Sequence, residues 1–144
     1  AALAAVLRLY TDPDRLADRL PTLRLLTRQA DEIAALARRV ALPLQAWLGD
    51  AAMVKIAPCQ SQIGSGSLPV ERLASTALMI RPATGKRGTG SALKRIAAAF
   101  RALPAPVIGR VQDDAFVLDL RCLMDEAGFC GQLAGLSVDG GTPP

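Results

Sequence analysis

Histidine is absent from this sequence of 144 residues, and aromatic residues are scarce, with one Trp, one Tyr and three Phe. Without histidine the chain cannot form a Ser-His or Cys-His catalytic pair, a zinc site with histidine ligands or an HExxH motif. With so few aromatic rings, stacking on unpaired nucleic-acid bases is not an expected mode of binding. We therefore predict no catalytic residue of these classes and no metal site in the chain.

Cysteine is also sparse. Cys59, Cys122 and Cys130 are odd in number and have no CxxC spacing. This pattern argues against a disulfide framework or a structural metal site, and it favours a reducing compartment, the cytoplasm. Because no histidine is available as a partner base, we expect the cysteines to be core residues rather than nucleophiles.

Long apolar runs are missing as well. No stretch approaches the roughly 20 apolar residues of a membrane span, so we expect no membrane partner. The opening run Ala1–Leu7 lacks the basic start and the cleavage pattern of a signal peptide. It begins in helical periodicity without a methionine or an N-cap, and we therefore expect the sequence to be the C-terminal piece of a longer chain.

Positive charge exceeds negative charge, with 17 Lys and Arg against 13 Asp and Glu and a pI of about 9.4. Arginine dominates, since the only lysines are Lys55, Lys86 and Lys94. Scattered surface charge is the simpler interpretation; a surface for phosphate or RNA is the alternative, because arginine suits bidentate phosphate contacts. None of the three lysines has the desolvated setting that a cofactor Schiff base needs.

Apolar periodicity divides the chain into helices and strands. The spacing predicts helices over residues 1–10, 13–20, 22–40, 42–48, 91–102 and 123–133. Alternation predicts strands over residues 53–57, 74–81, 107–111 and 116–120. Their order predicts an α+β fold, with a small antiparallel or mixed sheet and helices packed on one face.

The loop over residues 61–69 is the most unusual connection. Its serines and glycines offer backbone N–H groups for an anion-binding concavity. It lacks the third glycine of a dinucleotide fingerprint, and Gly85-Lys86 lacks the flanking residues of a P-loop. An ordinary connection and a loop that contributes to a site or an interface both stay open. The candidate loop residues are Ser61, Gln62, Gly64, Ser65, Gly66 and Ser67.

Four runs carry a more specific signal: Leu20–Arg28 (LPTLRLLTR), Ser61–Pro69 (SQIGSGSLP), Pro106–Arg110 (PVIGR) and Leu118–Leu123 (LDLRCL). Each is modest by itself. Together, in this order and spacing, they resemble the C-terminal part of the bacterial selenocysteine synthase family, the L-seryl-tRNA(Sec) selenium transferases. The resemblance extends over nearly the whole chain, from about residue 3 to residue 133.

The resemblance implies a pyridoxal-phosphate-dependent enzyme with the aminotransferase-like fold type I. Such an enzyme eliminates the hydroxyl of serine esterified to its tRNA and adds selenium from selenophosphate, giving selenocysteinyl-tRNA. It also implies a ring-shaped homo-oligomer built from dimers, with an N-terminal domain that grips the tRNA. The implied partners are therefore seryl-tRNA(Sec), selenophosphate and further copies of the chain, and not DNA.

The sequence departs from this family by omission. The family's cofactor lysine and the basic residues for the phosphate of the selenium donor lie upstream of the region that matches Ala1. The resemblance thus implies no catalytic or cofactor-binding residue in this chain, which alone should neither hold pyridoxal phosphate covalently nor catalyse the exchange. It implies that residues 1–20 are a helical connection from a large domain and residues 21–137 the C-terminal α+β small domain. The Gly, Thr and Pro composition of the last residues predicts a disordered tail over residues 138–144.

In fold type I enzymes the small domain closes over the cofactor cleft and supports the dimer. We therefore hypothesise that the loop over residues 61–69 faces the cleft or a neighbouring subunit. Arg24 and Arg28 are candidate contacts to tRNA or an acidic surface, although pairing with Asp31 and Glu32 on one helix surface is the simpler interpretation. A stand-alone basic RNA-binding module is one alternative. A dimerisation module, encouraged by a mean hydropathy of +0.27, is the other.

Overall fold

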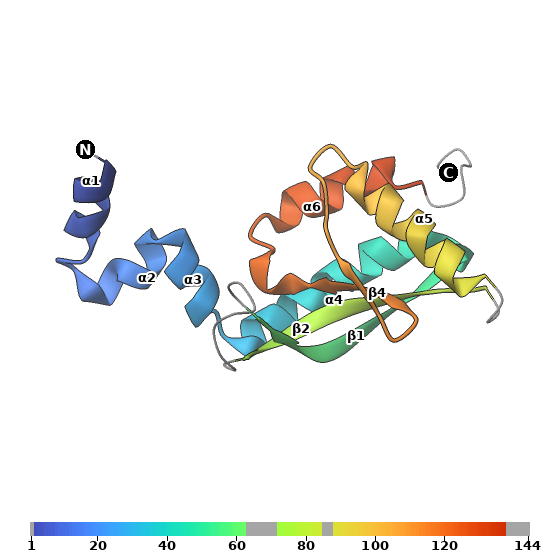
Figure 1. The fold of residues 1–144 in the computed structure, drawn as a ribbon, viewed down its shortest axis with the longest axis horizontal. Coiled ribbons are helices and arrows are strands. Elements are labelled where there is room, and N and C mark those ends of the chain that lie inside the picture. The colour runs from blue at the N-terminus through green and yellow to red at the C-terminus, as the bar shows by residue number, and fades with distance from the viewer. Residues whose placement is uncertain (1, 63–71, 85–87, 138–144) are drawn as a thin grey trace.

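The computed structural model of the protein describes residues 2–62, 72–84 and 88–137 (Figure 1). Its helices are α1 (Ala2–Leu9), α2 (Leu16–Arg19), α3 (Pro21–Thr27), α4 (Ala30–Leu48), α5 (Thr89–Arg101) and α6 (Glu126–Gln132). Its strands are β1 (Ala52–Ser61), β2 (Leu73–Pro82), β3 (Arg110–Gln112) and β4 (Ala115–Asp119). None of the described helices is long and apolar enough to cross a membrane. The tail expected at residues 138–144 lies outside the described residues.

The strands form one antiparallel sheet in the order β1-β2-β4-β3. β1 and β2 pair along their whole length, and β4 pairs with β2 on one side and with β3 on the other. A two-residue turn joins β3 to β4. Its residues, Asp113 and Asp114, have φ angles of 51° and 55°, the left-handed geometry that matches the twist of a tight hairpin.

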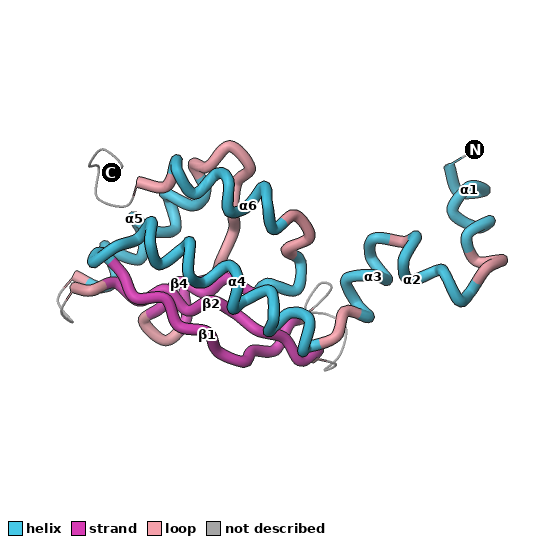
Figure 2. The backbone as a smooth tube through the Cα atoms, turned by 180° about the vertical axis from the view of Figure 1, so that it is seen from behind, coloured by secondary structure: helices cyan, strands magenta, loops and turns pink. Residues whose placement is uncertain are grey.

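Helices α4, α5 and α6 lie on one face of the sheet, and no described helix lies on the opposite face (Figures 1 and 2). The covered face shares one core with the helices, in which Phe100 of α5 and Phe116 of β4 have ring centroids 5.3 Å apart. Further core residues are Ile33, Leu36, Val40, Leu44, Leu78, Ile80, Leu93, Ile96, Leu118 and Leu133. The predicted α+β fold, with an antiparallel sheet and helices on one face, is confirmed.

The helix predicted over residues 22–40 is wrong in its middle, where the chain forms two helices instead of one, whereas the helical continuation predicted over residues 42–48 is confirmed. α3 stops at Thr27 because the backbone of Arg28 turns extended, with a ψ of 127°, and α4 begins beyond it. α4 then continues through Pro43 to Leu48. Proline removes one helical N–H, but the buried stripe of α4 runs on both sides of it, so burial against the sheet keeps the helix continuous.

Two other predicted boundaries shift. The strand expected to stop at Pro58 continues as β1 to Ser61, since β1 lies at the edge of the sheet, where proline is tolerated. The last helix, expected from Leu123, begins at Glu126. The Asp125 carboxylate sets this start by accepting a hydrogen bond from a backbone N–H of the first turn.

The first three helices form an arm (residues 2–27) that reaches away from the α+β body (residues 30–137), as Figure 1 shows. None of the three contains a buried residue. The side chains of Leu3, Leu7 and Tyr10 are 72%, 57% and 55% exposed. The apolar side of α1 is therefore uncovered within the described residues.

Candidate functional site

The face of the sheet opposite the helices, which we call the open face, combines a small apolar centre with a polar border. Side chains alternate between the two faces along each strand. The centre is Ala77, Ala115 and Val117, each at most 2% exposed, with Cys59 and Met79 packed against it. By strand register, the same face carries the polar side chains of Lys55, Ser61, Ser75, Arg81, Arg110, Gln112 and Asp119.

Asp119, at the end of β4, ties three segments together. Its carboxylate accepts hydrogen bonds from the hydroxyls of Ser61 (2.5 Å) and Ser75 (2.7 Å) and from the backbone N–H of Arg121 (3.1 Å). Burial by itself would raise the pKa of Asp119, but these donors and the charge of Arg110 outweigh it and hold the pKa below its ordinary value. The carboxylate is therefore ionised at neutral pH.

Two shallow hollows open beside this carboxylate. One, of about 290 Å³, is lined by Gln60, Gln62, Arg72, Arg110, Gln112 and Asp119. Its neighbour, of about 310 Å³, reaches over the apolar centre to Cys59, Met79 and Val117. Arg72 and Arg110 line both hollows. This end of the open face thus gathers two guanidinium groups and several amides around one carboxylate.

Gly109 lets Arg110 reach this position. A Cβ at Gly109 would lie 2.6 Å from the Phe116 ring and 2.7 Å from the Val117 carbonyl oxygen, so only glycine allows the chain to approach β4 this closely. The strand predicted over residues 107–111 accordingly pairs with β4 only from Arg110 onward.

The predicted loop begins at this end of the open face. Ser61 is buried at the end of β1, and Gln62 lines the 290 Å³ hollow. Gly64, Ser65, Gly66 and Ser67 lie outside the described residues. Sequence reasoning missed Asp119, Arg72 and Arg110 as neighbours of this loop. Asp119 lies at the end of β4, far from Ser61 in the sequence, and only the order of the strands in the sheet brings the two residues together.

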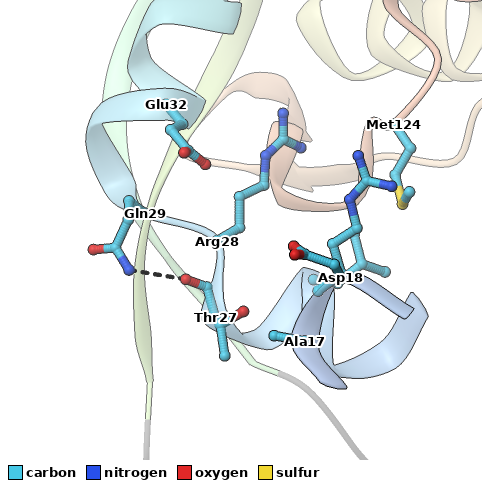
Figure 3. A pocket seen from close by; sticks show the side chains of 9 residues that line it. Ala17, Asp18, Thr27, Arg28, Gln29, Glu32 and Met124 are labelled. Atoms are coloured by element: carbon cyan, nitrogen blue, oxygen red, sulfur yellow. Dashed lines mark hydrogen bonds between the residues drawn. The ribbon is translucent and has the colours of Figure 1, made fainter. Parts of the chain in front are cut away.

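A larger pocket, of about 390 Å³, lies at the junction of the arm and the α+β body (Figure 3). It is lined by Ala17, Asp18, Arg24, Leu25, Thr27, Arg28, Gln29, Glu32 and Met124. Both candidate arginines therefore lie on one pocket. Arg24 is exposed there, whereas Arg28 is half-buried.

Arg28 points across this junction. Its Nη1 donates to the carbonyl oxygens of Leu120 (3.3 Å), Arg121 (3.1 Å) and Leu123 (2.8 Å). The predicted pairing of Arg28 with Asp31 or Glu32 is wrong, because the helix ends at Thr27 and the guanidinium turns to these carbonyls instead. Among the described residues the ion pairs are Arg19–Asp12 and Arg39–Glu126.

Arg121 makes the reciprocal contacts, from the segment after β4 to the end of the arm. It is 3% exposed, and its Nη1 donates to the carbonyl oxygens of Leu25 (2.9 Å), Leu26 (3.4 Å) and Arg28 (3.0 Å). Its Nη2 donates to the Ala74 carbonyl oxygen (2.6 Å) at the start of β2. Arg28 and Arg121, which we call the arginine clamp, thus join the end of the arm to the sheet. Nothing in the sequence marked Arg121 for this role.

Among the described residues, no cysteine or lysine has the setting of an activated nucleophile. Burial raises the pKa of Cys59, as does the charge of Asp119, and burial also raises the pKa of Cys130. Cys122 is exposed, so the prediction that it is a core residue is wrong. Lys55 and Lys94 are exposed. Within the described residues no cluster of Cys, Asp and Glu could hold a metal ion.

Comparison with known proteins shows which family this chain resembles in sequence. The family model described as SelA, L-seryl-tRNA selenium transferase, matches residues 1–124. A Methylocella silvestris protein named L-seryl-tRNA(Sec) selenium transferase is 50% identical over 96% of this chain and 29% of its own length. Proteins of the same name from Klebsiella pneumoniae (strain 342) and Yersinia pestis are 57% and 56% identical over 92% and 93% of this chain. The chain spans 28–29% of the length of these relatives.

Proposed function

The chain belongs to the L-seryl-tRNA selenium transferase family, and we propose that it is the C-terminal part of a bacterial selenocysteine synthase. In this proposal the whole enzyme converts L-seryl-tRNA(Sec) to L-selenocysteinyl-tRNA(Sec), with selenophosphate as the selenium donor and pyridoxal phosphate as the cofactor. The observation that carries it is the family match over residues 1–124. A stand-alone RNA-binding or dimerisation module is not favoured, because the relatives that match 92–96% of this chain are named as transferases.

Pyridoxal phosphate supplies an electron sink for carbanion chemistry when a lysine holds it. The described lysines do not fit that role, since Lys55 and Lys94 are exposed and a Schiff-base lysine needs a desolvated pocket. Lys86 lies outside the described residues. We propose that the cofactor lysine belongs to another part of the enzyme, and that this chain alone neither binds the cofactor covalently nor transfers selenium.

For this chain we propose a part in closing the active-site cleft and in assembling a homo-oligomer built from dimers, in a cytoplasmic enzyme. Residues 1–20 are proposed as the connection to a large domain and residues 21–137 as the small domain. Two observations support this division of labour: the apolar side of α1 is exposed, and the open face carries polar groups that its own helices do not cover.

The loop after β1 is proposed to face the cleft or a neighbouring subunit. Its support is the Ser61–Asp119 hydrogen bond, which fixes the start of the loop on the open face. In the whole enzyme we expect the double substitution Ser65→Ala and Ser67→Ala to lower turnover or assembly, while Ser91→Ala, at an exposed position of α5, changes neither. Equal turnover and assembly in both variants would count against this placement.

Arg24 is the arginine that we propose for contact with tRNA or an acidic surface. It is exposed on the junction pocket. Arg28 shares the pocket as the second candidate, but its Nη1 is already engaged with three carbonyl groups. Within the pair, Arg24 therefore carries the larger share of any such contact.

The proposed function is tested by exchange with a relative. This chain replaces the matching 28% of the Klebsiella pneumoniae enzyme, and the chimaera is assayed for selenium transfer from selenophosphate to seryl-tRNA(Sec) with pyridoxal phosphate. We expect activity within about tenfold of the parent, and none when the segment is deleted. A chimaera that folds, assembles and binds the cofactor but transfers no selenium would contradict the proposal.

A further inference from the structure

Two arginines from separate segments of the chain line the 290 Å³ hollow on the open face. Arg72 immediately precedes β2, and Arg110 is the first residue of β3. Both line this hollow and its neighbour. Within the described residues neither arginine forms an ion pair with a carboxylate. Two guanidinium groups on one concave surface, neither of them ion-paired with a carboxylate of the described residues, are suited to bind an oxyanion.

Arg110 is held at one edge of its guanidinium, beside the Cys59 thiol and near the Asp119 carboxylate. Its Nε donates to the Gln112 side-chain oxygen (3.2 Å), and the Gln112 amide nitrogen donates to the Asp113 carboxylate (3.2 Å). The two Nη groups of Arg110 donate to no oxygen of the described residues. A guanidinium that is fixed at one edge can use its other edge for bidentate contact with a ligand. Binding then costs less conformational entropy than it would for a freely rotating side chain.

The charge of the hollow favours a monoanion. Arg72 and Arg110 each contribute a positive charge, and Asp119 contributes a negative one. The Asp119 oxygens already accept three hydrogen bonds, and Arg110 acts on this carboxylate through its charge, without a hydrogen bond to it. Among the described lining residues, the remaining single positive charge matches a phosphodiester better than a free phosphate dianion.

The other lining groups fit an RNA strand. The side-chain amides of Gln60 and Gln62 border the hollow and can exchange hydrogen bonds with ribose hydroxyls. Among the described residues that line it none is aromatic, which indicates contact with the RNA backbone rather than stacking on bases.

We propose that this hollow binds a phosphodiester group of the RNA substrate, with Arg72 and Arg110 donating to its non-bridging oxygens. The inference rests on the proposed function, which supplies a tRNA as the partner. It adds the place on this chain where the RNA backbone is held.

The test compares R72Q/R110Q with R101Q in the whole enzyme. Arg101 is an exposed arginine on α5, on the covered side of the sheet, and serves as the control for loss of a positive charge away from the hollow. The probe is a fluorescein-labelled tRNA(Sec) transcript titrated at several KCl concentrations. We expect R72Q/R110Q to bind about tenfold more weakly or worse, with a salt slope smaller by roughly 1–2. KM for seryl-tRNA should rise with kcat kept within about twofold, and R101Q should match the wild type.

Equal tRNA affinity in R72Q/R110Q and R101Q, or no tRNA binding by the wild type, would overturn the inference. So would a loss of inorganic phosphate binding without a loss of tRNA binding, since that outcome identifies a site for the free ion. Failure of the proposed function is seen separately, as a wild-type enzyme that transfers no selenium whatever its affinity for the tRNA.

Discussion

The arm and the α+β body have similar apolar patterns but opposite degrees of burial. Both contain amphipathic helices, yet every buried residue of the described chain lies at Ile33 or beyond. In α4 the apolar stripe packs on the sheet, whereas in α1 Leu3 and Leu7 remain exposed. Apolar periodicity therefore identifies the side of a helix that is suited to burial, but it does not identify the surface that covers that side.

The arginine clamp is where the two regions meet. The Arg28 guanidinium donates hydrogen bonds to carbonyl oxygens of residues 120–123. The Arg121 guanidinium donates to carbonyl oxygens at the end of α3 and of Arg28 just beyond it. The carbonyls at the end of a helix lack partners inside the helix. The buried guanidinium of Arg121 satisfies them and so fixes the direction in which the arm leaves the body.

The largest difference between the regions is expected for a substitution in the core. Phe100 is fully buried against Phe116. Phe100→Ala should therefore lower the free energy of unfolding by about 3–5 kcal/mol, through lost burial and the cavity left behind. Urea denaturation of the chain followed by circular dichroism measures it. A loss below about 1 kcal/mol would mean that the helices do not pack on the sheet as described.

Breaking the clamp should have the next largest effect, and it should act on the junction. Arg121→Met removes the donors to four carbonyl oxygens. Because it also removes a buried charge, we expect a net loss of about 2–3 kcal/mol. The amides of α3 should lose more protection from hydrogen exchange than those of α5.

Arg121→Lys is the control for the clamp, because it keeps the charge and loses the planar fork of donors. We expect it to fall between the wild type and Arg121→Met. Unchanged exchange in α3 with Arg121→Met would show that the clamp does not hold the arm.

The sequence predicted the body better than the junction, for physical reasons. The α+β class and most of the elements follow from local periodicity, which depends on residues close in the chain. The break at Arg28 does not, because the donors and acceptors that stabilise it come from residues 120–123. The open-face site follows the same rule: Ser61 was predicted from its polar loop, but Asp119 and Arg110 join it only through the order of the strands.

Asp119 allows a test of the smaller polar contribution within the body. Its pKa is lowered in the folded protein, so the stability that it contributes is present above its unfolded pKa and is lost as the pH falls through the folded pKa. The carboxylate is only about half buried, and solvent screening reduces its contribution. We expect Asp119→Asn to cost about 1 kcal/mol at pH 7.

The pH dependence of the unfolding free energy distinguishes the contribution of the Asp119 charge from that of its hydrogen-bond geometry. The difference in unfolding free energy between the wild type and Asp119→Asn should shrink as the pH falls below about 4, the ordinary aspartate pKa. Urea denaturation at pH 7, 5 and 3 measures it. A difference that stays constant down to pH 3 would assign the effect to the lost acceptor geometry rather than to ionisation.

The smallest effect is expected in the arm. Leu7 is 57% exposed on a helix with no buried residue, and alanine is the best helix former. Leu7→Ala should therefore change the unfolding free energy by less than about 0.5 kcal/mol, although it removes more apolar carbon than many costly core substitutions. A loss above about 1 kcal/mol that grows with protein concentration would mean that another copy covers α1. The apolar side of the arm would then be buried by association with another copy, whereas the core of the body is buried by folding.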